Sequence, residues 1–217
     1  MIQDNVRKIL EELPAQVELE AAAKTRSVKE IEQAVAGGVK IIGENYVQEA
    51  ESAQAVIGRK ARWHFIGHLQ KNKVKKAVKI FDLIETLDSQ KLAEALDQAA
   101  AGANKVMPVL VEVNSAGEQQ KFGVLPERVL SFIKGLLPLN NIKVVGLMTM
   151  GPAVGDPAAS RPYFEKTKRI FERIKDLDLD GLEMKYLSMG MSDTYQIAIE
   201  EGANIVRVGS AIFGPRE

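Results

Sequence analysis

Short apolar runs alternate with amphipathic stretches along the whole chain. Most of the runs are bounded by Gly, Pro, Asn or Ser, which is typical of strands buried on both faces of a parallel sheet. The stretches between them repeat apolar residues at helical spacing, which predicts helices between the strands. The predicted strands are Val17–Ala23, Val39–Ile42, Arg62–Ile66, Leu83–Leu87, Met107–Val113, Val144–Met148, Met184–Leu187 and Ile205–Val208.

Helix start signals support this alternation. Ser27-Val28-Lys29-Glu30 has the pattern of a capping box, in which Ser27 and Glu30 satisfy each other's backbone N–H groups. Asp88-Ser89 predicts another helix start, and Pro126 and Pro162 suit first helical positions. A further helix is predicted before the first strand, over Asp4–Leu13.

Eight strands with intervening helices favour a single (β/α)8 barrel domain of the TIM type over residues 1–217. A doubly wound open sheet is the alternative. Because the sequence ends soon after the eighth strand, we expect the N-terminal helix to occupy the place of a final barrel helix.

Composition narrows the possible functions. Lys plus Arg and Asp plus Glu each number 29, which argues against a polyanion-binding protein and gives no reason to expect a nucleic-acid partner. Cys is absent, and His64 and His68 are the only histidines, so thiolate and His-rich metal sites are excluded. No apolar run approaches the ~20 residues of a membrane-spanning helix. We therefore expect a cytoplasmic protein with no membrane partner and no metal.

Lys24 is the most informative residue at the strand ends, where barrel proteins place their sites. It follows Ala21-Ala22-Ala23, whose small side chains leave room for a ligand. In such a pocket the neutral amine of a lysine can attack a carbonyl, which predicts a Schiff-base lysine. A solvated or ion-paired lysine at a strand end is the alternative.

The ends of the seventh and eighth strands form the second candidate site. Ser188-Met189-Gly190-Met191-Ser192 and Gly209-Ser210 supply glycines and hydroxyls where barrels often bind phosphate. Two ordinary turns would have the same composition. Arg207 lies within the last predicted strand, so its side chain points either into the barrel or towards the helices.

Other candidates carry less information. His64 and His68 lie on either side of the end of the third predicted strand, and loop histidines near a cleft are the ordinary interpretation of such a pair. Met148 and Met150 are either ligand contacts or core residues. The basic run from Lys71 to Lys79 is typical of a solvated helix face.

Seven segments, in order along the chain, carry a family resemblance. They are Lys24-Thr25-Arg26, Gly43-Glu44-Asn45-Tyr46-Val47-Gln48-Glu49, Trp63-His64-Phe65-Ile66-Gly67-His68-Leu69-Gln70-Lys71-Asn72-Lys73, Gly146-Leu147-Met148-Thr149-Met150, Arg161-Pro162-Tyr163-Phe164, Leu187-Ser188-Met189-Gly190-Met191-Ser192 and Arg207-Val208-Gly209-Ser210-Ala211-Ile212-Phe213-Gly214. In these segments the sequence resembles the pyridoxal phosphate homeostasis proteins, which look like the barrel domain of alanine racemase.

The resemblance implies a pyridoxal 5'-phosphate (PLP) site and no catalytic residues. It implies that Lys24 holds the cofactor as a Schiff base and that Arg207 faces the pyridine nitrogen. The other implied contacts are Ser192, Gly209 and Ser210 at the phosphate with Ser188 nearby, Asn45 and Met148 at the ring, and His68 close to the pocket. Ser210 stands where the family often has Thr, which keeps the hydroxyl.

The family also implies binding and delivery of the cofactor rather than turnover of a substrate. PLP-dependent apoenzymes and PLP-synthesising enzymes are then the expected partners. Racemases of this barrel type use a base from a separate β-domain of a neighbouring subunit, and without such a domain we expect a monomer. Three alternatives are a small amino-acid racemase with a second base opposite Lys24, a Schiff-base aldolase acting on sugar phosphates, and a nucleic-acid binder using the Lys71–Lys79 helix.

Overall fold

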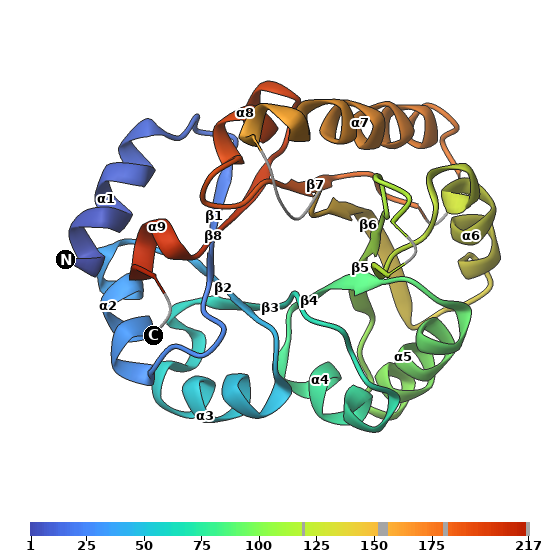
Figure 1. Cartoon of the computed structure of the whole chain (residues 1–217). Helices are drawn as coiled ribbons and strands as arrows, with labels where there is room; N and C mark the ends of the chain where they lie inside the picture. Colours follow the sequence, from blue (N-terminus) through green and yellow to red (C-terminus); the bar gives the residue numbers. More distant parts are fainter. Residues whose placement is uncertain (119, 152–155, 180–181, 216–217) are drawn as a thin grey trace.

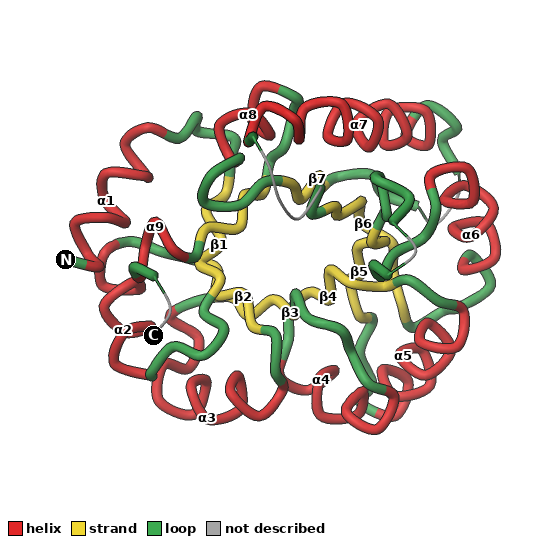
Figure 2. The backbone as a smooth tube through the Cα atoms, in the orientation of Figure 1, coloured by secondary structure: helices red, strands yellow, loops and turns green. Residues whose placement is uncertain are grey.

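Eight parallel strands close into a barrel in the computed structural model, which describes residues 1–118, 120–151, 156–179 and 182–215. Figure 2 shows the strands as a central ring surrounded by helices. The strands follow one another around the barrel in chain order, and β1 pairs with β8 to close it. Their bounds are β1 Glu18–Ala22, β2 Ile41–Glu44, β3 Arg62–Phe65, β4 Leu83–Leu87, β5 Met107–Glu112, β6 Ile142–Thr149, β7 Tyr186–Met189 and β8 Ile205–Val208.

All eight predicted strands are present, and none of their ends differs from the prediction by more than two residues. The pairing of Glu20 with Arg207, from opposite ends of the chain, excludes the open sheet. The barrel prediction is therefore confirmed.

Helices surround the barrel and connect its strands (Figure 1). The α-helices are α1 Ile2–Glu12, α2 Val28–Gly37, α3 Val47–Ile57, α4 Val74–Ile80, α5 Gln90–Gly102, α6 Val129–Leu136, α7 Arg161–Lys175, α8 Tyr195–Glu200 and α9 Ser210–Phe213. The 3-10 turns are η1 Gly58–Lys60, η2 Lys71–Lys73, η3 Pro126–Arg128 and η4 Pro157–Ser160. The capping box is confirmed, since the Ser27 side chain accepts from Glu30 N and the Glu30 side chain accepts from Ser27 N. Within the described residues, no helix is both long and apolar enough to cross a membrane.

The N-terminal helix α1 lies between α2 and α8 in the outer ring (Figure 1). Its Asn5 side chain donates to the Ile212 carbonyl in α9 at 3.0 Å. Tyr195 at the start of α8 donates to Glu12 at 3.3 Å. These contacts confirm that α1 completes the outer ring where a helix after β8 is expected.

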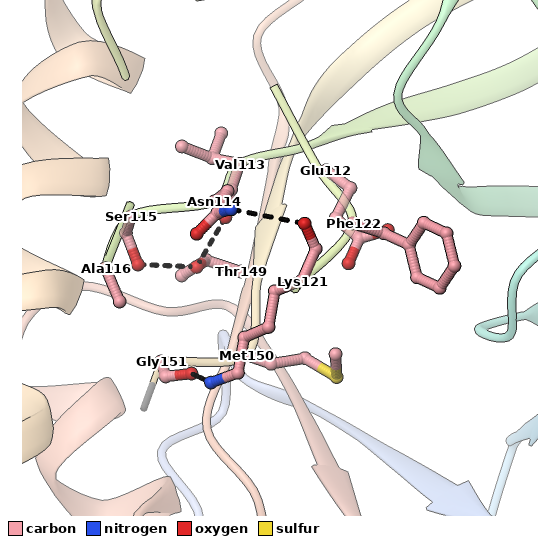
Figure 3. Close-up of a pocket in the computed structure, with 10 residues that line it drawn as sticks. All are labelled: Glu112, Val113, Asn114, Ser115, Ala116, Lys121, Phe122, Thr149, Met150 and Gly151. Atoms are coloured by element: carbon pink, nitrogen blue, oxygen red, sulfur yellow. Dashed lines mark hydrogen bonds between the residues drawn. The ribbon is translucent and has the colours of Figure 1, made fainter. Parts of the chain in front are cut away.

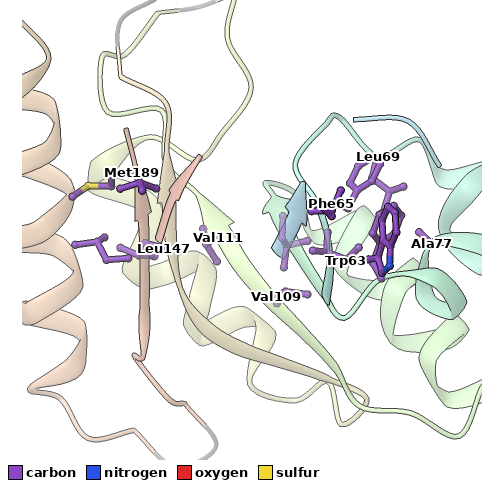
Figure 4. Close-up of a cluster of buried hydrophobic side chains, with 14 of the residues drawn as sticks. Trp63, Phe65, Leu69, Ala77, Val109, Val111, Leu147 and Met189 are labelled. Atoms are coloured by element: carbon purple, nitrogen blue, oxygen red, sulfur yellow. The ribbon is translucent and has the colours of Figure 1, made fainter. Parts of the chain in front are cut away.

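The hydrophobic core lies mainly between the barrel and its helices. Figure 4 shows outward-facing residues of several strands, among them Trp63, Phe65, Leu147 and Met189, packed in this layer. The barrel interior holds a smaller apolar cluster of Leu83, Leu110, Val145 and Met148. Much of the remaining interior is polar, and its charged residues lie below the site described next.

Candidate functional site

A cavity of about 530 Å³ opens at the carboxyl ends of the strands. The loops after β1, β2, β6, β7 and β8 contribute to its wall. Its lining residues are Ala22, Lys24, Arg26, Asn45, Ile66, Met150, Met191, Ser192, Asp193, Arg207, Gly209 and Ser210. The cavity is therefore large enough for a small ring with a phosphate group, and it combines cationic, hydroxyl and apolar surfaces.

The turn that presents Lys24 is held by neighbouring loops. Thr25 adopts a left-handed conformation with a φ of 64°, which is unusual for a β-branched residue. Its backbone N–H donates to the Glu49 carboxylate of α3 at 3.0 Å. The Arg26 side chain donates to the Gly214 carbonyl at 2.6 Å and thereby joins this turn to the end of α9. The Lys24 amine lies 5.6 Å from the centre of the Tyr46 ring, at the cavity.

A group of hydrogen-bond donors converges at the ends of β7 and β8. The backbone N–H groups of Gly209 and Ala211 both donate to the Ser192 hydroxyl, each at 3.2 Å. A Cβ atom at Gly209 would lie 3.3 Å from the Ala22 carbonyl, so the residue passes close to the neighbouring strand. Converging backbone N–H groups and hydroxyls are the chemistry that binds phosphate oxygens.

Arg207 reaches the cavity from below, with only 4% of its surface exposed. Its guanidinium donates to the Ser188 hydroxyl at 2.6 Å and to the Thr149 carbonyl at 2.9 Å. Ser188 in turn donates to the Glu85 carboxylate at 2.6 Å. The side chain therefore points into the barrel, which settles the orientation that strand alternation alone left open.

Two more buried side chains lie beyond Glu85. The Nδ1 atom of His64 lies 2.8 Å from Glu85 Oε1 and 2.9 Å from Glu20 Oε2. Burial opposes ionisation of His64, but its contacts with Glu20 and Glu85 outweigh it and raise the His64 pKa to about 10. Burial and the nearby Glu85 charge raise the pKa of Glu20, whereas burial at Glu85 is outweighed by His64, which lowers the Glu85 pKa. These directions favour an ionised Glu85 beside a protonated His64, and they favour the neutral form of Glu20.

A second, narrow pocket lies beside the cavity and shares Met150 with it. Figure 3 shows how its loops are tied together. Ser115 and Thr149 lie 2.9 Å apart and share a hydrogen bond, and Lys121 donates to the Gly151 carbonyl at 3.1 Å. These bonds fix the loop after β5 against the end of β6. They therefore hold in place the segment from which Met150 lines the cavity.

The cavity brings together most of the residues that the sequence predicts for the site. The six that line it are Lys24, Asn45, Ser192, Arg207, Gly209 and Ser210. Ser188 lies below it, between Arg207 and Glu85, and Met148 is buried with the apolar cluster inside the barrel. His68 is exposed and stacks on Phe122, with ring centres 3.9 Å apart.

His64 lies within β3, as the predicted strand Arg62–Ile66 has it, but it points into the barrel and is not a loop histidine near a cleft. Sequence reasoning also missed Glu20 and Glu85 altogether. Charged residues inside otherwise apolar strands were the available signal, since a buried charge requires a partner. Ala22 and Met150, which the sequence also named beside the site, line the cavity, whereas Arg26, Ile66, Met191 and Asp193 line it without having been predicted.

Glu44, at the end of β2, is a buried carboxyl outside the cavity. Alternation turns it away from the barrel interior, because a Cβ at neighbouring Gly43 would lie within 2.9 Å of Glu20 Cδ inside the barrel. Neither Glu44 oxygen has a hydrogen-bond partner among the described residues. Burial, and then the charge of Glu49, raise the pKa of Glu44 to about 8, although the Asn45 backbone acts in the opposite direction.

The buried Glu44 carboxyl makes the stability of the folded protein depend on pH. Because its pKa is higher in the folded state, Glu44 stabilises the fold below its ordinary pKa of 4.5, and that contribution is lost as the pH rises through about 8. At about pH 9, the free energy of unfolding of Glu44→Gln should therefore exceed that of the wild-type protein by at least about 1 kcal/mol. At about pH 5 the two proteins should have nearly the same free energy of unfolding. Urea unfolding at both pH values measures this, with exposed Glu11→Gln as control. An equal difference from wild type at both pH values would contradict the assignment.

Comparison with known proteins places this geometry in a family. The family model described as alanine racemase, N-terminal domain, matches residues 1–217. The chain is 41% identical over 197 residues to the pyridoxal phosphate homeostasis protein of Aquifex aeolicus, covering 90% of this chain and 86% of that protein. The chain belongs to the pyridoxal phosphate homeostasis protein family. The mouse member is 36% identical over 230 residues, covering 100% of this chain and 83% of its own.

Solved structures that are similar to this chain have the same barrel fold. PipY of Synechococcus elongatus, solved without PLP, is 32% identical with a TM-score of 0.92, covering 99% of this chain and 100% of its own. PipY with PLP bound is 31% identical with a TM-score of 0.90 and the same coverage. An alanine racemase of Clostridium difficile, 18% identical with a TM-score of 0.81, shares the barrel over 99% of this chain and 56% of its own. That last similarity concerns the fold alone.

Proposed function

We propose that this protein binds PLP in the cavity, linked as a Schiff base to Lys24, and takes part in intracellular PLP homeostasis by holding or delivering the cofactor. The observation that carries the proposal is that Lys24, Arg207 and the donors around Ser192 line one cavity. Family membership and the structure of PipY with PLP bound support the choice of cofactor.

The residues present fit the chemistry of this group. The Lys24 amine suits its aldehyde, and the converging N–H groups of Gly209 and Ala211 suit its phosphate. Arg207 provides a buried cation that can donate to the ring nitrogen. Bound PLP supplies an electron-withdrawing ring, and an arginine at its nitrogen keeps that nitrogen unprotonated, which weakens the ring as an electron sink.

A carrier is favoured over a racemase by the groups around the cavity. Racemisation by two bases requires a second proton-transfer group opposite Lys24. Among the described residues that line the cavity, Asp193 is the only carboxylate, and its side chain is exposed. We therefore propose that the protein is not an enzyme. We also propose that residues 1–217 form one cytoplasmic, monomeric cofactor-binding domain.

Absorption spectroscopy and a racemase assay test the proposal together. Titration of the purified protein with PLP should produce a saturable visible band, and the loaded protein should not interconvert the alanine or serine enantiomers. The absence of the band would contradict PLP binding. Interconversion that is lost in Lys24→Ala would instead support the racemase.

A further inference from the structure

The buried polar groups below the cavity have no direct cofactor contact in the proposed function, yet they are joined to it through Arg207. We propose that Ser188 and Glu85 are positioning residues that hold the Arg207 guanidinium towards the ring nitrogen of PLP, and that His64 and Glu20 anchor Glu85 from below. This inference rests on the proposed function, because it assumes that PLP occupies the cavity.

The hydrogen bonds define one position for the guanidinium. Nη1 of Arg207 donates to Ser188 and Nη2 donates to the Thr149 carbonyl at the end of β6. Arginine has five N–H donors in a rigid plane, so these two bonds fix the plane and leave other donors for a ligand. Arg207 is therefore held by the neighbouring strands β6 and β7 before any cofactor binds.

Ser188 serves as a relay between two charged groups. Its hydroxyl accepts from Arg207 and donates to Glu85 Oε2, both at 2.6 Å, so its one O–H donor is used within the floor of the cavity. Nη1 of Arg207 lies 4.0 Å from Glu85 Oε2. The Ser188 hydroxyl bridges Arg207 and Glu85. It therefore keeps the two charges apart at this distance, with the guanidinium facing the cavity. Ser188 therefore has a role separate from the phosphate contacts at Ser192.

The charge of Arg207 requires this support. Arg207 and Glu85 are 4% and 0% exposed, and an unpaired charge at such depth is strongly destabilising. The second oxygen of Glu85 is engaged by His64, and His64 is also engaged by Glu20. These contacts hold the carboxylate in place on both sides. Strand β8 therefore supplies the cation, β4 supplies its counter-charge, and β3 and β1 supply the groups that orient the counter-charge.

A buried metal ion is the competing interpretation of the lower groups, because carboxylate oxygens of Glu20 and Glu85 and a ring nitrogen of His64 lie within 4.8 Å of one another. However, both carboxylates are already at hydrogen-bond distance from the same Nδ1 atom. A metal bound at Nδ1 would require that atom to be without its proton. The proposed arrangement therefore requires a proton on Nδ1 of His64, and a metal ion bound at that atom would contradict it.

A double-mutant experiment tests whether Ser188 and Glu85 act through Arg207. Ser188→Ala and Glu85→Gln are compared in the wild-type background and in Arg207→Met, with Glu18→Gln as control, because Glu18 pairs with Arg62 elsewhere in the barrel. The readouts are PLP affinity, the position of the visible band of bound PLP, and the melting temperature of the cofactor-free protein. Ser188→Ala and Glu85→Gln should each weaken PLP affinity about tenfold and shift the band in the wild-type background, and should change neither in Arg207→Met. Glu18→Gln should leave both unchanged.

Equal effects in both backgrounds, or unchanged affinity and band in a folded Ser188→Ala protein, would overturn the inference. If the Arg207→Met proteins do not fold, Ser188→Thr decides, since it keeps the hydroxyl and should restore the band that Ser188→Ala shifts. Stoichiometric Zn²⁺ binding by the cofactor-free protein that is lost in His64→Gln would also contradict it. Failure of the proposed function is distinguishable, because wild type itself would then show no band.

Discussion

Lys24→Ala should fold like wild type and lose PLP during gel filtration. Lys24 is half-buried in the short turn after β1, and none of the hydrogen bonds that hold the turn uses its side chain, so its removal leaves the barrel intact. The covalent link, by contrast, needs the amine. We expect PLP affinity to fall at least about a hundredfold, or about 2.7 kcal/mol, in an absorbance titration.

Lys29→Ala is the matched control for this prediction. Lys29 lies five positions further along the chain, on the exposed face of α2, and does not line the cavity. It should bind PLP as wild type does. Retention of the visible band by Lys24→Ala, with unchanged affinity, would contradict the assignment of Lys24.

Gly146→Ala should be the most destabilising substitution that adds a single methyl group. A Cβ atom at this position in β6 would lie 2.7 Å from the Tyr186 carbonyl carbon and nearer still to its oxygen. Because both partners are paired backbone within the barrel, neither can move without breaking the β6–β7 register. We expect the free energy of unfolding to fall by at least about 3 kcal/mol, measured by urea denaturation.

Gly102→Ala provides the control. Gly102 is the last residue of α5, and a Cβ there would meet nothing within 4 Å. Since alanine favours helix over glycine, this variant should be as stable as wild type or more stable by up to about 1 kcal/mol. A Gly146→Ala protein of wild-type stability would show that β6 and β7 do not pair as described.

The strands were predictable because each is a short apolar run between turn residues, and their parallel order follows from the helices between them. Their ends were less predictable. The strand predicted over Val144–Met148 extends to Ile142–Thr149, because backbone pairing with β5 continues through the polar Lys143. Ser188 and Met189 belong to β7 although their composition is typical of a turn. Pairing with a neighbouring strand decides such positions, and it is not visible in a local pattern.

The upper part of the site was predictable from strand ends and family motifs, whereas its floor was not. Lys24, Ser192 and Gly209 lie one to three residues past the ends of their strands, and in a barrel such positions converge. Glu20, Glu85 and His64 lie inside three different strands, and their contacts depend on which residues face inwards. A one-residue change of register would separate them, so only the closed barrel shows that they are partners.

The most direct test of PLP binding at Lys24 is the location of the covalent link. The protein is incubated with PLP, reduced with borohydride, digested and analysed by mass spectrometry, with Lys24→Ala treated in parallel. We predict one reduced pyridoxyl group per chain, on Lys24, and none at a defined position in the variant. A modified lysine elsewhere, at the same yield in both proteins, would contradict the proposed site.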